Sequence, residues 1–138
     1  MPANTPTEQQ MVSAAEQREN ARLVTDHISG HHGGEGNTKY DDLFAPDVRI
    51  FLDSREDYPI GEITAVGLDA LRKNTADLKN VGFTYEIEVH SVYTCGPVVV
   101  VCRTDTRKEE GKPDKPVPAV GVFALKNGKV VEWSDYYR

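Results

Sequence analysis

The chain has few cysteines and no long hydrophobic run. Its two cysteines, Cys95 and Cys102, are too few for a disulfide framework or a cysteine-based zinc site. They flank an expected tight turn at Gly96-Pro97, and we expect two buried, reduced thiols, with a cross-strand disulfide as the alternative. No stretch of about 18 apolar residues occurs, so we expect no membrane span. The first ten residues lack the pattern of a secretory signal, which favours a cytoplasmic protein.

A surplus of positive charge is also absent. The chain holds 16 basic and 22 acidic residues, a formal charge of −6, which argues against a nucleic-acid partner. Its 38% hydrophobic and 28% charged residues are typical of a soluble globular protein. With 138 residues in all, we expect a disordered tail over 1–7 and a single domain over 8–138.

Hydrophobic spacing predicts helices in the first half of the chain. One helix is expected from about Glu8 to Ser29, ended by Gly30. A short helix is expected over 40–44, stopped by Ala45-Pro46-Asp47, and a longer one over 68–79. A short strand is expected over 48–52, and loops over 31–37 and 53–62.

In the second half the apolar residues alternate with polar ones, as in half-buried strands. Strands are predicted over 83–90, 98–107, 117–125 and 130–137. A charged hairpin is expected over 108–115, and Asn127-Gly128 is a typical hairpin turn. Helices followed by an antiparallel meander predict an α+β domain with helices packed on one face of the sheet.

Three charged residues are predicted to lie on otherwise apolar strand faces. Arg103 and Asp105 follow Val99 and Val101 on one face, because alternate residues of a strand point the same way. By the same alternation Val131, Trp133, Asp135 and Tyr137 share a face of the last strand. Charges in such surroundings must be paired or lie near water. A cup-shaped sheet would bring the three together, and one guanidinium can hold two carboxylates.

Two carboxylates bridged by an arginine in an apolar pocket have a chemical use. One can stay neutral as an acid while the other is ionised as a base. Such a pair suits the addition of water to a strained ring, without a metal or covalent intermediate. The pattern alone also fits a structural ion pair, since an Arg-x-Asp pair on a strand is commonly exposed.

Three segments carry a resemblance to a known family. They are Leu43-Phe44-Ala45-Pro46-Asp47-Val48, Cys102-Arg103-Thr104-Asp105 and the stretch from Gly121 to Tyr137 that contains Trp133-Ser134-Asp135. Together they resemble the limonene-1,2-epoxide hydrolases and SnoaL-like proteins of the nuclear-transport-factor-2-like superfamily. The resemblance implies a cone-shaped α+β fold with a curved mixed sheet packed against three helices, one deep pocket, and a homodimer.

The resemblance also implies roles for individual residues. Asp135 would be the base that activates water, Asp105 the acid that protonates the epoxide oxygen, and Arg103 the bridge between them. No cofactor or metal would be needed, and the partners would be a small apolar epoxide and water. Further substrate contacts are expected from six residues: Trp133, Tyr137, Ile50, Leu52, Tyr85 and Ala119.

One departure from the family concerns the attacking water. The hydrolases hold it with a tyrosine and an asparagine, whose positions fall on Ile50 and Leu52 here, and neither side chain can form a hydrogen bond. The candidates to replace them are Asp53, Tyr58 and Tyr85. Arg107 would add a charge near the mouth of the pocket and favour a more polar substrate.

Other functions stay open at this point. An acid–base isomerase or a polyketide cyclase on the same scaffold is one alternative, and a non-catalytic protein that binds a small ligand is another. His31 and His32, with His27 nearby, have the ligand type of a metal site, although a solvated loop is the favoured interpretation. His90 is expected at the surface or in an interface.

Overall fold

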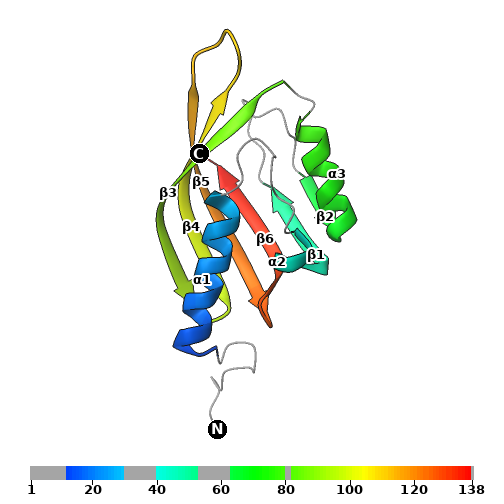
Figure 1. Ribbon diagram of the computed structural model, residues 1–138, viewed down its shortest axis with the longest axis vertical. Coiled ribbons are helices and arrows are strands. Elements are labelled where there is room, and N and C mark those ends of the chain that lie inside the picture. Colours follow the sequence, from blue (N-terminus) through cyan, green and yellow to red (C-terminus); the bar gives the residue numbers. More distant parts are fainter. Residues whose placement is uncertain (1–11, 30–39, 53–62, 80–81, 138) are drawn as a thin grey trace.

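The computed structural model describes residues 12–29, 40–52, 63–79 and 82–137, which form three helices and six strands (Figure 1). In chain order these are α1 (Ala14–Ser29), α2 (Tyr40–Leu43), β1 (Phe44–Leu52), β2 (Ile63–Val66), α3 (Leu68–Lys79), β3 (Thr84–Cys95), β4 (Val98–Lys108), β5 (Lys115–Lys126) and β6 (Lys129–Tyr137). The predicted tail over 1–7 and the loops over 31–37 and 53–62 lie outside the described residues.

The six strands form one mixed sheet in the order β2-β1-β6-β5-β4-β3. Strands β3 to β6 are an antiparallel meander, and β1 joins β6 in parallel. Helix α1 crosses β3 and β4, while α3 packs beside β1 and β2 (Figure 1). The predicted α+β class with a mixed sheet is therefore confirmed. Two helices rather than three cover the sheet, because α2 is a single turn of four residues.

The start of α1 is fixed by a local capping arrangement. The backbone N–H of Glu16 donates to Ser13 Oγ at 3.1 Å, and that of Gln17 donates to the Ser13 carbonyl. Ser13 is therefore the N-cap of the helix, a position where a hydroxyl satisfies an otherwise unpaired N–H group. The predicted start near Glu8 lies outside the described residues, and the helix itself begins only at Ala14.

The strands differ from the prediction in several boundaries and in one additional strand. β3 continues to Cys95, five residues beyond the predicted end at residue 90. Phe44 is the first residue of β1 rather than the end of a helix, because it pairs with Val130 of the neighbouring β6. Ala45-Pro46-Asp47 therefore lies within the strand, across a register shift between Phe44 and Arg49. The short strand β2 was not predicted, because its four residues gain strand structure only by pairing with β1.

A bulge changes the face assignment of β6. Ala124 pairs with Glu132 but Leu125 pairs with Val130, so Val131 is an extra residue. The predicted sharing of one face by Val131 and Trp133 is therefore wrong, and Val130 takes the buried position instead. The predicted turn before this strand is confirmed, since Asn127 and Gly128 both have positive φ, at 52° and 75°.

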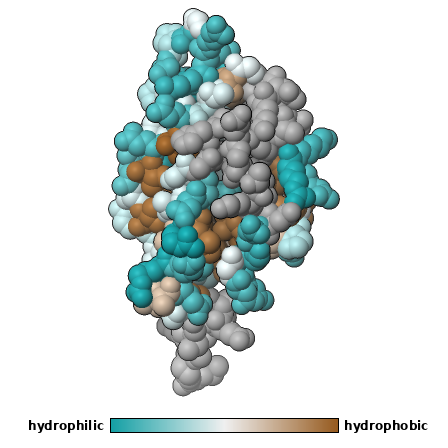
Figure 2. All heavy atoms as spheres, in the orientation of Figure 1, coloured by the Kyte–Doolittle hydropathy of each residue, from teal (hydrophilic) through white to brown (hydrophobic). Residues whose placement is uncertain are grey.

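The hydrophobic core lies between the helices and one face of the sheet, called here the inner face. It contains Val24 and Ile28 of α1, Leu71 of α3, and residues of the strands: Phe44, Val48, Ile50, Val99, Val101, Phe123, Leu125 and Val130. Hydrophilic residues dominate the β4–β5 hairpin, and hydrophobic atoms appear in small areas beside α1 (Figure 2). No helix among the described residues is long and apolar enough to span a membrane.

The cysteines are free thiols, as expected, but they are not both buried. Cys95 is exposed at the end of β3, while Cys102 is half-buried on β4. The expected turn at Gly96-Pro97 joins these two strands, and Gly96 has a φ of 56°. Cys95 pairs with Val98, whereas Cys102 pairs with Ser91 farther along the ladder, so the strand register separates the two thiols.

Candidate active site

The centre of the inner face carries charge instead of hydrocarbon. Arg103 and Asp105 lie on β4, and Asp135 lies on β6, with β5 between them. Neighbouring strands are about 4.8 Å apart, so the arginine must span two strand spacings to reach Asp135. The β5 residues beneath it are small, since Ala119 pairs with Arg103, and Gly121 pairs with Asp135.

Arg103 holds both aspartates through separate edges of its guanidinium. Its Nε donates to Asp105 Oδ1 at 2.9 Å, and its Nη2 donates to Asp105 Oδ2 at 3.1 Å. Toward Asp135, Nη1 donates to Oδ1 at 3.2 Å, and Nη2 donates to Oδ2 at 2.8 Å. The structure thus brings the three predicted catalytic residues together in one bridged cluster.

Asp135 receives two further hydrogen bonds that the sequence did not indicate. The indole Nε1 of Trp133 donates to Oδ1 at 2.7 Å, and the hydroxyl of Tyr137 donates to Oδ2 at 3.2 Å. A carboxylate has about four lone-pair sites, and all four are occupied here. Asp105, by contrast, accepts only from Arg103 among the described residues. The two carboxylates therefore have different environments.

All three side chains are buried. The exposed fractions are 4% for Arg103, 6% for Asp105 and 3% for Asp135. Burial raises the pKa of the Asp105 carboxyl, and this outweighs the opposing effect of Arg103. Burial alone would lower the pKa of Arg103, but the two carboxylates together raise it, so the guanidinium stays charged. The cluster can hold a neutral acid beside a permanent cation.

Gly121 leaves the space that the guanidinium occupies. A Cβ built on this residue would lie 2.7 Å from Arg103 Nη1 and 3.0 Å from Asp135 Oδ1. It would also lie 2.9 Å from the ring of Phe123, which stacks on Trp133 at 5.6 Å between centroids. This role of Gly121 was not assigned from the sequence. The two small residues Ala119 and Gly121, which lie two positions apart on β5, could have indicated it.

The other residues predicted to contact substrate lie at several places along the sheet. Ile50 is buried opposite Trp133, and Leu52 pairs through its backbone with Asp135. Tyr85 lies farther along β3, opposite Arg107, so it is in the next row of side chains beyond Asp105. Asp53 and Tyr58, proposed from sequence to hold water, lie outside the described residues, as do His31 and His32.

The remaining histidines do not form a metal centre. No cluster of potential metal-binding side chains occurs within the described ranges. His27 packs edge-on against Phe44, with 5.1 Å between ring centroids. His90 is exposed as expected, and its Nε2 lies 2.7 Å from Thr104 Oγ1.

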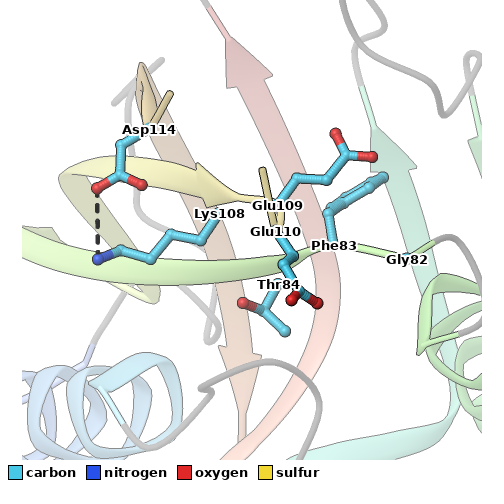
Figure 3. Close-up of a pocket in the computed structure, with 7 residues that line it drawn as sticks. All are labelled: Gly82, Phe83, Thr84, Lys108, Glu109, Glu110 and Asp114. Carbon is cyan, nitrogen blue, oxygen red and sulfur yellow. Dashed lines mark ion pairs between the residues drawn. The ribbon is translucent and has the colours of Figure 1, made fainter. Parts of the chain in front are cut away.

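A surface hollow of about 450 Å³ lies at the base of the β4–β5 hairpin (Figure 3), and Arg103 is not among the residues that line it. Seven residues line it: Gly82, Phe83, Thr84, Lys108, Glu109, Glu110 and Asp114. It is polar and open, unlike the deep apolar pocket expected at the aspartates. That pocket stays a prediction.

The strand order, with one parallel pair in a curved sheet and helices over the inner face, defines the nuclear-transport-factor-2-like fold. Within this class the chain belongs to the SnoaL-like domain family, which matches residues 33–133. None of the curated proteins matches the chain.

Solved structures of low sequence identity share the fold. A protein described as a SnoaL-like polyketide cyclase from Jannaschia sp. CCS1 is 20% identical, with a TM-score of 0.72 over 98% of this chain and 91% of that one. An epoxide hydrolase from M. tuberculosis, described as LEH-like, is 21% identical, with a TM-score of 0.60 over 89% and 85%. A protein of ketosteroid-isomerase-like fold from Catenulispora acidiphila, in complex with trimethylamine, is 18% identical, with a TM-score of 0.64 over 83% and 84%.

Proposed function

We propose that the protein is an epoxide hydrolase that adds water to a small, mostly apolar epoxide and yields a vicinal diol. The observation that supports this most is the buried Arg103 that holds two carboxylates of unequal environment. Asp105 has a raised pKa and can be the proton donor. Asp135 accepts four hydrogen bonds, which fix the position of its carboxyl group, and it is our candidate for the base.

In the proposed reaction the oxygen of a water molecule attacks one ring carbon while the bond between that same carbon and the ring oxygen breaks. Asp135 takes a proton from the water, and Asp105 gives its proton to the departing ring oxygen. The product is a diol that contains one added water, and exchange with solvent restores both carboxyl groups. General acid and general base catalysis each contribute about 10²–10⁴ in rate.

Tyr137 is our candidate for the residue that places the water. Of the groups that donate to Asp135, only its hydroxyl can also accept a hydrogen bond, since guanidinium and indole N–H groups cannot. A water that inserts between Tyr137 and Asp135 Oδ2 would keep both as partners. This arrangement would replace the hydrogen-bonding pair that Ile50 and Leu52 lack.

The test is diol formation from a panel of small epoxides in water labelled with heavy oxygen. The native protein is compared with Asp105→Asn, Asp135→Asn and Tyr137→Phe, and Tyr136→Phe is the matched control because Tyr136 is exposed on the other face. We expect labelled diol from the native protein and the control. Activity should be lost in both asparagine variants and fall about 10- to 100-fold in Tyr137→Phe, mainly in kcat. No diol from any epoxide would contradict the proposal.

A second candidate is an isomerase or cyclase that moves a proton on a carbonyl substrate. The observation that favours it is the full set of donors on Asp135, which leaves Asp105 as the carboxyl with open acceptor sites. A single carboxyl that shuttles a proton would not need Tyr137. Exchange of α-protons of small ketones for deuterium, abolished by Asp105→Asn but not by Tyr137→Phe, would favour this candidate.

Ligand binding without either reaction would indicate a binding protein. The homodimer and the cytoplasmic location stay predictions.

A further inference from the structure

The side chains on the inner face change from apolar to basic along the direction of β4. Its first row contains Val99, with Phe123 and Trp133 on the neighbouring strands. The next rows contain Arg103 and Asp105 with their partner Asp135. One row beyond Asp105, Arg107 lies between Tyr85 and Lys115. An apolar end and a basic end thus lie on opposite sides of the two aspartates.

Arg107 is held in place at the basic end. Its guanidinium carbon lies 4.0 Å from the centre of the Phe83 ring, and its side chain is 23% exposed. Its Nη2 is 3.3 Å from Glu109, whose carboxylate lies beside the Phe83 ring in Figure 3. Stacking orients the plane of the guanidinium and leaves its edge, with the N–H groups, for hydrogen bonds.

Basic side chains outnumber acidic ones around a hollow beside Arg107. A hollow of about 200 Å³ is lined by Arg107, Glu109, Lys112, Pro113 and Lys115, which are three cations and one anion. Glu109 is shared between Arg107 and Lys112, whose Nζ lies 3.2 Å away. The nearby Asp114 pairs with Lys108, which points away from Glu109 (Figure 3). One carboxylate is therefore shared by Arg107 and Lys112, and Lys115 lines the same hollow.

We infer that the substrate is amphiphilic, with an apolar body, a reactive centre and an anionic group such as a carboxylate. The apolar body lies toward Trp133, the reactive centre lies at Asp105, and Arg107 with Lys115 binds the anion. Two residues along a strand span about 7 Å, which sets the distance between the reactive centre and the anion. The inference rests on the proposed function in one respect, because it assumes that the substrate binds with its reactive centre at Asp105. It does not depend on which reaction takes place there.

Binding of two matched unreactive probes tests this inference. The fluorescence of Trp133, the only tryptophan, is titrated with 4-phenylbutyrate and with 4-phenyl-1-butanol. We expect the carboxylate to bind about tenfold more tightly at low salt, because a charge-assisted hydrogen bond replaces a neutral one. The preference should shrink as salt screens the cations. In Arg107→Gln it should fall to about twofold or less.

Two further variants keep the test decisive. Arg49→Gln is the matched control, because Arg49 is an exposed arginine of β1 that pairs with Glu132, and it should keep the full preference. Lys115→Gln should lower the preference in part, and it replaces Arg107→Gln if that variant does not fold. The inference is overturned if neither probe binds, if the native protein shows no preference, or if removing the cation leaves the preference unchanged. A preference without diol formation would contradict only the proposed reaction.

Discussion

In the described part of the chain, Arg22 and Arg103 each bridge two carboxylates, and the first bridge is exposed while the second is buried. On α1, Arg22 contacts Glu19 at 2.5 Å and Asp26 at 2.9 Å, and all three side chains are more than half exposed. In the sheet, Arg103 contacts Asp105 at 2.9 Å and Asp135 at 2.8 Å, with exposed fractions below 10%. The two arginines make similar contacts, but the side chains differ in their exposure to solvent.

The difference changes the direction of the carboxyl pKa. The hydrogen bond from Arg22 lowers the pKa of Glu19, because at this exposed site it outweighs the opposing effect of desolvation. Burial raises the pKa of Asp105 although Arg103 lies within hydrogen-bonding distance, at 2.9 Å. An exposed pair is screened by water and contributes little, whereas a buried charge depends on its partners. The same arrangement of one arginine and two carboxylates is therefore an ordinary surface ion-pair cluster on α1 and a candidate acid–base site in the sheet.

The largest expected effect is the loss of one carboxylate from the buried bridge. Asp135→Ala leaves Arg103, Trp133 and Tyr137 without a common acceptor, and should lower the free energy of unfolding by about 3–5 kcal/mol. Asp26→Ala removes the equivalent carboxylate from the exposed bridge and should have no resolvable effect. Urea denaturation of both variants measures the contrast. Equal losses would show that burial does not distinguish the two bridges.

Removing the indole donor should have a smaller effect. Trp133→Phe keeps an aromatic ring for stacking on Phe123 but loses the hydrogen bond to Asp135. A hydrogen bond to a charged group contributes about 1.5–3 kcal/mol, and the free energy of unfolding should fall by about that amount. Urea denaturation at neutral pH measures it. A loss as large as that of Asp135→Ala would mean that ring packing, rather than the N–H group, accounts for the effect.

A methyl group at Gly121 should disturb the bridge by steric contact. Because its Cβ would lie 2.7 Å from Arg103 Nη1, Gly121→Ala should lower stability by about 1–3 kcal/mol and abolish turnover. Gly111→Ala is the control, since Gly111 has a φ of 79° but open space around its Cβ. The control should lose stability through backbone strain while turnover stays unchanged. Full activity in Gly121→Ala would argue against the bridge as the catalytic centre.

The raised pKa of Asp105 predicts a difference in stability that depends on pH. The folded protein holds this proton more tightly than the unfolded chain, so the stabilisation is complete below the unfolded pKa, about 3.9, and is lost as pH rises through the raised folded value. Asp105→Asn stays neutral throughout. The native protein should therefore lose stability relative to this variant across that window. Thermal unfolding at several pH values measures the difference, and an opposite trend would mean that Arg103 outweighs burial.

The sequence predicted the strands that alternate clearly, and with them the face that Arg103 and Asp105 share on β4. It did not predict β2, whose four residues depend on pairing with β1. Nor did it predict the bulge at Val131, which shifts the pattern of β6 by one residue. Bulges and short strands arise from pairing between distant segments, and local hydrophobic spacing does not contain that information.

The candidate site was predictable only in part, because it too depends on pairing between distant segments. Alternation indicated that Arg103 and Asp105 share a face, but their meeting with Asp135 depends on the curvature and register of three strands. The donation of Trp133 and Tyr137 to the same carboxylate became visible only in the folded sheet. The space above Gly121 is likewise a property of two neighbouring strands.

The measurement that tests the central claim most directly is the titration of the Asp105 carboxyl carbon by ¹³C NMR. Its resonance is assigned as the one that disappears in Asp105→Asn, and no substrate is needed. If burial keeps this carboxyl available as an acid, it titrates above the ordinary aspartate value of about 3.9. Titration at or below that value would mean that Arg103 dominates, and that the buried bridge is a structural ion pair like its exposed counterpart on α1.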